Sequence, residues 1–96
     1  MRIARVVGSA VSTIKVDSLT GTKLLVVRET SVSDELEGRP FVAVDSVGAG
    51  EGELVLVSEG SAGRHTDLTA DTPVDAVIMA ILDSLEVGGE TTFRKS

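Results

Sequence analysis

The sequence contains no cysteine, tryptophan or tyrosine, and it has one histidine and two phenylalanines among its 96 residues. Without cysteine the chain has no disulfide framework, no thiol nucleophile and no thiolate ligand for zinc. Two aromatic rings, those of Phe41 and Phe93, are too few to stack the bases of a single-stranded nucleic acid. These absences remove several classes of enzyme and nucleic-acid binder before any motif is considered.

Positive charge is also scarce, because fifteen acidic residues outnumber nine basic ones and give a net charge of -6. Lysine and arginine supply most of the affinity of proteins for phosphate backbones, so the balance argues against a nucleic-acid partner. No apolar run approaches the length of a membrane span, so no membrane partner is expected. The opening "MRIARVVGSAVST" is interrupted by Gly8 and Ser9, and we interpret it as a first strand rather than a signal peptide.

What the sequence does have is aliphatic and β-branched residues, which favour strands. We predict strands over residues 2–14, 23–29, 41–47, 53–59 and 90–95, with Gly8 marking a bulge or a barrel bend in the first. Residues 74–87 fit either a helix or a buried strand, and we favour mostly strand after one helical turn. Ser61 is a second candidate for starting a short helical turn. Gly88 and Gly89 predict a hairpin turn before the last strand.

The predicted strands "LLVV", "FVAV", "LVLV" and "VIMAIL" do not alternate between apolar and polar residues. A strand with one wet face normally alternates, so both faces of these strands are expected to be covered. The chain lacks the helices that usually supply the second cover, and a monomer would expose large apolar patches. The pattern therefore predicts an oligomer in which another copy of the chain covers the outer faces.

The glycine cluster at Gly48, Gly50 and Gly52 raises the possibility of a phosphate-binding loop. Its spacing is G-x-G-x-G, whereas a dinucleotide fingerprint needs G-x-G-x-x-G opening a helix. Here a predicted strand follows, and Glu51 and Glu53 would repel phosphate. We interpret the cluster as a tight bend between strands, with Asp45 hydrogen-bonded to the amides of the bend.

Catalytic and metal-binding residues are not evident. His65 lies near Ser61, Asp67 and Asp71 in sequence, but a catalytic triad is defined by geometry and not by sequence spacing. The surroundings are typical of a polar surface loop rich in turn-forming residues. One histidine and scattered carboxylates provide no metal-ligand spacing. We expect no catalytic residue, no cofactor and no metal site.

Several stretches together resemble the EutN/CcmL family, the pentameric vertex proteins of bacterial microcompartment shells. They are "RIARVVGSAVST", "GTKLLVV", "FVAVDSVGAGEGELVLVSEGSAGR", "TPVDAVIMAILD" and "VGGETTFRK", which cover nearly the whole chain in order. The chain departs from the family pattern in the turn ending at Arg64, where Ala62 and Gly63 replace the usual residues. It also has Ala80 where the family usually has glycine.

The resemblance implies a mostly-β fold, a small closed OB-like β-barrel with one short helical turn that assembles into a cyclic homo-oligomer. It implies one shell domain over residues 1–96, with 90–95 as its C-terminal strand. The implied function is structural: pentamers that close the vertices of a cytoplasmic microcompartment shell and contact hexameric shell proteins. A small OB-like binding module without catalytic activity is the alternative.

We further hypothesise that residues 61–64 lie near the axis or rim of the ring, with Arg64 pairing with Asp45 or Glu51 of the next copy. The candidate residues of the subunit interface or axial loop are Asp45, Gly48, Gly50, Glu51, Ser61 and Arg64.

Overall fold

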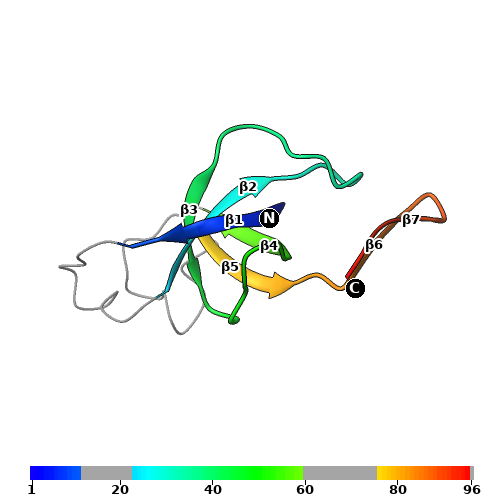
Figure 1. Cartoon of the computed structure of the whole chain (residues 1–96). Coiled ribbons are helices and arrows are strands. Elements are labelled where there is room, and N and C mark those ends of the chain that lie inside the picture. Colours follow the sequence, from blue (N-terminus) through cyan, green and yellow to red (C-terminus); the bar gives the residue numbers. More distant parts are fainter. Residues whose placement is uncertain (12–22, 60–75, 96) are drawn as a thin grey trace.

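Five strands close into a small barrel in the computed structural model, which describes residues 1–11, 23–59 and 76–95. The barrel order is β1–β2–β3–β5–β4, with β4 returning to β1 (Figure 1). All neighbours are antiparallel except β3 and β5, which run parallel. The strands are β1 (Arg2–Ala10), β2 (Leu24–Glu29), β3 (Phe41–Asp45), β4 (Leu54–Glu59) and β5 (Ala76–Ile81). The predicted closed, mostly-β barrel of OB-like type is confirmed.

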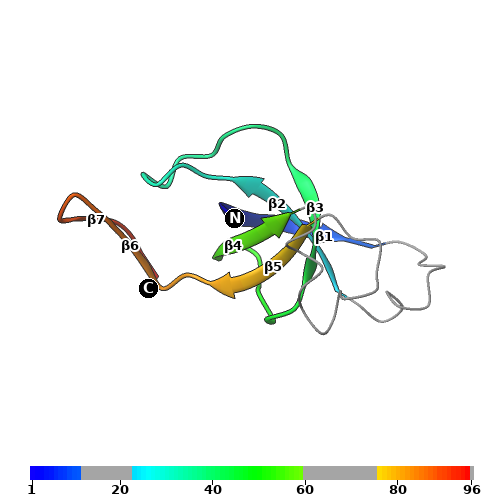
Figure 2. The ribbon, with the colours of Figure 1, turned by 180° about the vertical axis from the view of Figure 1, so that it is seen from behind.

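Two further strands form a separate hairpin, which we call the arm: β6 (Ser84–Val87) and β7 (Glu90–Arg94). Gly88 and Gly89 form its turn with φ values of 59° and 84°, as the predicted hairpin requires. The arm extends away from the barrel in the front and back views (Figures 1 and 2). The arm is therefore an extension of the barrel, and its two strands do not belong to the barrel sheet.

The barrel interior is filled by small and medium aliphatic side chains. Leu25 and Val27 of β2 alternate with outward-facing Leu24 and Val26, as the two-residue period of a strand requires. The inner cluster contains no fully buried aromatic ring, which suits a barrel this narrow. Its buried members are Ala4, Val6, Leu25, Val27, Ala43, Ala49, Val55, Val57, Ala76 and Ile78.

The predicted bulge at Gly8 is confirmed, because the β1–β2 register shifts between Val6 and Gly8. The prediction of one strand through residues 74–87 was wrong at its centre. The backbone N–H of Leu82 makes a last barrel bond to the carbonyl of Leu54, at 2.8 Å, and the chain then leaves the barrel. A break at Leu82 and Asp83 separates β5 from β6.

The described residues contain no helix, and none of them therefore forms a helix able to cross a membrane. The helical turns predicted after Ser61 and before β5 fall outside the described residues.

Candidate functional site

The glycine-rich segment over residues 46–53, which we call the glycine bend, connects β3 to β4. Its first half is organised by Asp45, whose side chain is only 2% exposed. One oxygen of this carboxylate accepts the backbone N–H groups of Val47, Gly48 and Ala49 at 3.1, 3.1 and 3.2 Å. Lys23 donates from Nζ to the carbonyl of Ala49 at 2.9 Å, which places its charge 3.9 Å from Asp45. The predicted role of Asp45 in satisfying the amides of the bend is thus confirmed.

The second half of the glycine bend is organised by Glu53. Its Oε1 accepts the N–H of Gly50 at 2.7 Å, and its own N–H donates to the carbonyl of Gly50 at 3.1 Å. The N–H of Gly52 donates to the carbonyl of Val6 at 2.8 Å, while Arg5 donates to the carbonyl of Gly52 at 2.6 Å. These bonds fasten the bend to β1.

The geometry of the glycine bend explains its composition and excludes a phosphate cradle. Gly48 and Gly52 have φ values of 76° and 90°, in the left-handed region that side chains rarely enter. A phosphate-binding loop directs free amides toward its ligand. Here the amides of residues 47–50 are taken up by the carboxylates of Asp45 and Glu53. The bend is a barrel corner, as the spacing of its glycines predicted.

The outer side of β2, β3 and β5 carries a second apolar surface. Val44 and Val77 form a small cluster distinct from the barrel interior, with half-buried Leu24 and Met79 packed against it. Val26 is half-buried beside it, and Val42 remains 50% exposed. We define the outer apolar face as Leu24, Val26, Val42, Val44, Val77 and Met79, of which Val44 and Val77 are already buried within the chain, at 2% and 0% exposed. The inner and outer faces are therefore both apolar, as the lack of alternation in the sequence indicated.

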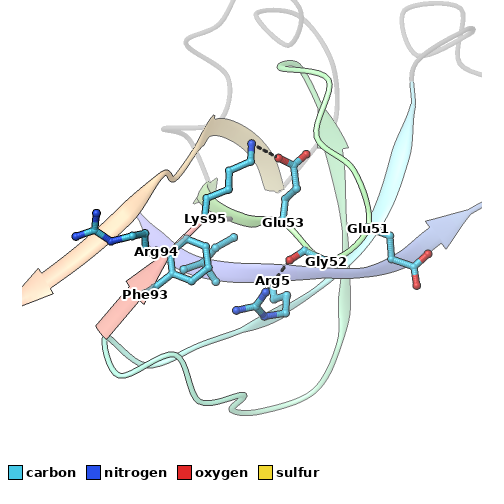
Figure 3. A pocket seen from close by; sticks show the side chains of 8 residues that line it. Arg5, Glu51, Gly52, Glu53, Phe93, Arg94 and Lys95 are labelled. Carbon is cyan, nitrogen blue, oxygen red and sulfur yellow. Dashed lines mark hydrogen bonds and ion pairs between the residues drawn. The ribbon is translucent and has the colours of Figure 1, made fainter. Parts of the chain in front are cut away.

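The arm is attached to the barrel beside the glycine bend, around a pocket of about 340 Å³ (Figure 3). Nζ of Lys95 donates to Oε2 of Glu53 at 2.7 Å, and the backbone N–H of Lys95 donates to the carbonyl of Asp83 at 2.7 Å. The guanidinium of Arg5 lies 5.6 Å from the centre of the Phe93 ring, within cation–π distance.

The ion pair between Glu53 and Lys95 at the base of the arm, which we call the anchor, shifts the pKa of both groups. The hydrogen bond from Lys95, followed by that from the Gly50 amide, lowers the pKa of Glu53 below its ordinary 4.5. The hydrogen bond to Glu53 raises the pKa of Lys95 above its ordinary 10.5. Both groups are therefore charged throughout the neutral range, and the anchor persists there.

The candidate interface residues on the glycine bend differ in how exposed they are. Gly48 and Glu51 are exposed on the glycine bend, Gly50 is half-buried, and the Asp45 side chain is enclosed. Ser61 and Arg64 lie outside the described residues, so their proximity to the ring axis stays a prediction. The Asp45 carboxylate already accepts three amides, whereas Glu51 is exposed, and the pairing of either with Arg64 of another copy stays a prediction.

The attachment of the arm was missed by sequence reasoning. Glu53 and Lys95 are 42 residues apart, and no local pattern connects them. Arg5 likewise meets Phe93 across nearly the whole chain. A weak signal exists in retrospect, because Phe93 is an isolated aromatic residue in a polar final strand.

Acidic side chains in the described part of the chain are spread over the barrel, and no group of three or more metal-ligand residues forms there. The two innermost carboxylates already have backbone and lysine partners. These carboxylates hold the glycine bend and the base of the arm in place.

Comparison with known proteins identifies one family along most of the chain. Residues 1–83 match the family described as ethanolamine utilisation protein EutN/carboxysome. The microcompartment shell vertex protein PduN of Salmonella typhimurium is 49% identical, over 88% of this chain and 98% of the relative.

Solved structures of proteins with the same family names have the same fold as this chain. CcmL of Nostoc sp. PCC 7120 superposes with a TM-score of 0.92 at 43% identity, over 99% of this chain and 100% of that one. GrpN of Rhodospirillum rubrum, a pentameric microcompartment shell protein, gives a TM-score of 0.82 at 42% identity. That match covers 91% of this chain and 99% of GrpN.

Proposed function

Because the chain belongs to the EutN/CcmL family, we propose that it is a structural subunit whose pentamers form the vertices of a bacterial microcompartment shell. The family prediction made from the sequence is confirmed. Relatives named as shell vertex proteins match nearly their full length, and a solved relative is a pentamer. The subunit accordingly works in the shell of a cytoplasmic compartment.

The observation that carries the proposal is the outer apolar face. A free barrel has no reason to leave Val42 50% exposed beside half-buried Leu24 and Met79, whereas a ring subunit needs such a surface for its neighbours. A cyclic ring requires a heterologous interface, in which one patch meets a different patch on the next copy. An outer apolar face on one side of a barrel supplies one half of that contact.

No catalytic role is included in the proposal. The most enclosed carboxylate, Asp45, holds backbone amides, and Glu53 holds Gly50 and Lys95. These side chains are committed to maintaining the corner of the barrel and the base of the arm. As its relatives are named shell vertex proteins, the proposal also includes other shell proteins as partners of the ring, and hexameric ones are expected to surround it.

Reconstitution of shells tests the vertex role. We expect co-production of this chain with its hexameric shell proteins to give closed polyhedral particles in electron micrographs. Omission of this chain should give open or irregular sheets and tubes, because flat hexagonal tiling cannot close without five-fold positions. Equally closed particles in its absence would contradict the proposal. The Val32→Ala chain is a control for expression, since Val32 is an exposed loop residue.

A further inference from the structure

The arm has little support from its own barrel. The described contacts lie at its base and along one edge: Lys95 with Glu53, Phe93 with Arg5, and the Thr92 hydroxyl donating to the carbonyl of Val32. The residues from Glu86 to Glu90 are exposed. A two-stranded hairpin is at best marginally stable in water unless it packs against another surface. The outer end of the arm therefore lacks the cover that a stable hairpin needs.

The outer end of the arm carries one exposed valine between two glutamates. Val87 is 43% exposed, and Glu86 and Glu90 flank the same end of the hairpin. Neither glutamate forms an ion pair with another described residue. The end of the arm thus presents an apolar centre with two negative charges beside it.

A complementary surface lies on the outside of the barrel. Val7 of β1, Val26 of β2 and Val42 of β3 form what we call the valine row; Val26 pairs directly with Val42, and the bulge brings Val7 next to Val26. Val7 and Val42 are 37% and 50% exposed.

Two arginines border the valine row. Arg28 follows Val26 on the same outer side of β2, and its Nε donates to the carbonyl of Gly38, which places Arg39 nearby. Neither arginine pairs with a carboxylate among the residues that the structure describes. The valine row is therefore an apolar strip with a positive border, the counterpart of the arm.

We propose that the end of the arm of one copy packs on the valine row of the neighbouring copy in the ring, with Glu86 and Glu90 facing Arg28 and Arg39. In both views the arm extends on the opposite side of the barrel from β3, the strand that carries Val42 (Figures 1 and 2). Two different patches thus meet around the ring, as cyclic closure requires. The inference rests on the proposed ring.

The family model matches residues 1–83 and ends directly before β6, although several relatives match 99% of the chain and so include the arm. We expect the barrel to form the basic ring contact and the arm to strengthen it. Loss of the arm contact should raise the protein concentration at which rings dissociate, without preventing ring formation at high concentration.

Crosslinking tests the contact directly, and the absence of cysteine makes the chain well suited to it. Thr91→Cys and Val42→Cys chains, one carrying a mass tag, are co-produced and treated with a short bis-maleimide. We expect mixed dimers to dominate over dimers of either chain with itself. Val47→Cys is the matched control for Val42→Cys, because Val47 is also a partly exposed valine but lies on the glycine bend.

Charge reversal tests the chemistry. Glu90→Lys and Arg39→Glu are each expected to raise the ring dissociation concentration several-fold, and the combined Glu90→Lys/Arg39→Glu chain should recover most of the loss. Mass photometry across a dilution series measures the concentration at which the rings dissociate. The single effects should shrink in high salt, since exposed ion pairs are screened.

The outcomes separate this inference from the proposed function. Rings with mixed crosslinks no more frequent than in the Val47→Cys control, or with no charge rescue, would overturn the arm contact while leaving the vertex function intact. A wild-type chain that stays monomeric at every concentration would overturn both.

Discussion

At the scale of single residues, two carboxylates determine the corner between β3 and β4. Asp45 collects three successive amides and Glu53 takes a fourth, so a segment without regular structure leaves few backbone groups unsatisfied. The contact of Asp45 is predictable from sequence because its partners lie two to four residues away. That of Glu53 with Lys95 is not, because only the closed barrel brings them together.

Replacement of Asp45 by alanine should remove the acceptor for three buried or partly buried amides. We expect Asp45→Ala to lower the free energy of unfolding by about 2–3 kcal/mol, the range for lost hydrogen bonds to a charged group. Urea denaturation at fixed protein concentration measures the change. Glu35→Ala is the control, because Glu35 is exposed and its side chain has no described partner. Equal effects of the two substitutions would contradict the role assigned to Asp45.

The glycines of the bend differ in backbone conformation, and so in the expected cost of replacing them by alanine. Gly52→Ala should cost about 1–2 kcal/mol, because a Cβ at φ 90° is strained even though nothing lies within 4 Å of it. Gly50→Ala is the matched comparison: its φ is ordinary and its Cβ would lie 3.5 Å from Glu53 Oε1, a normal contact. We expect Gly50→Ala to be nearly neutral in thermal unfolding. A larger loss at Gly50 than at Gly52 would show that space, not backbone conformation, limits this corner.

At the scale of elements, the strands were largely predictable and the departure of the arm was not. Four barrel strands begin within two residues of the predicted positions, because aliphatic runs bounded by glycine and polar residues are local signals. The break after Ile81 was missed because Leu85 and Val87 resume the apolar pattern directly after polar Asp83 and Ser84, so the whole run resembled one strand. Its position depends on where β4 stops offering partners, which is a property of the closed barrel.

The anchor of the arm makes a prediction about pH. Because the pKa of Glu53 is lowered in the folded chain, its stabilising contribution is complete above pH 4.5 and is lost as pH falls through the lowered value. Lys95→Met should move the midpoint of the Glu53 carboxyl titration, followed by ¹³C NMR, upward toward its ordinary value. Lys23→Met should move it much less, because Lys23 has only the smallest effect on Glu53. An unchanged midpoint in Lys95→Met would contradict the anchor.

At the scale of the whole molecule, the sequence predicted the need for a partner and the structure shows the surface that needs one. Runs such as "LLVV" and "FVAV" indicated two apolar faces, but they do not say which residue faces outward. The barrel assigns Leu24, Val26 and Val42 to the outside. The position of residues 61–64 near the ring axis stays a prediction, because these residues lie outside the described part of the chain.

The outer apolar face predicts a selective effect on assembly. Val42→Asp should dissociate rings while leaving the barrel folded, because it places a charge in the interface but not in the core. Val47→Asp is the matched control, since Val47 is also a partly exposed valine, at 37%, but lies on the glycine bend. Sedimentation velocity measures ring assembly, and circular dichroism measures whether the barrel remains folded. Equal loss of rings in the two variants would contradict the assigned face.

Native mass spectrometry of the purified protein shows directly whether five copies of the chain form one ring. We expect a dominant species of about 50 kDa, five times the 9.9 kDa of one chain. A chain that remains a 9.9 kDa monomer at micromolar concentration would contradict it.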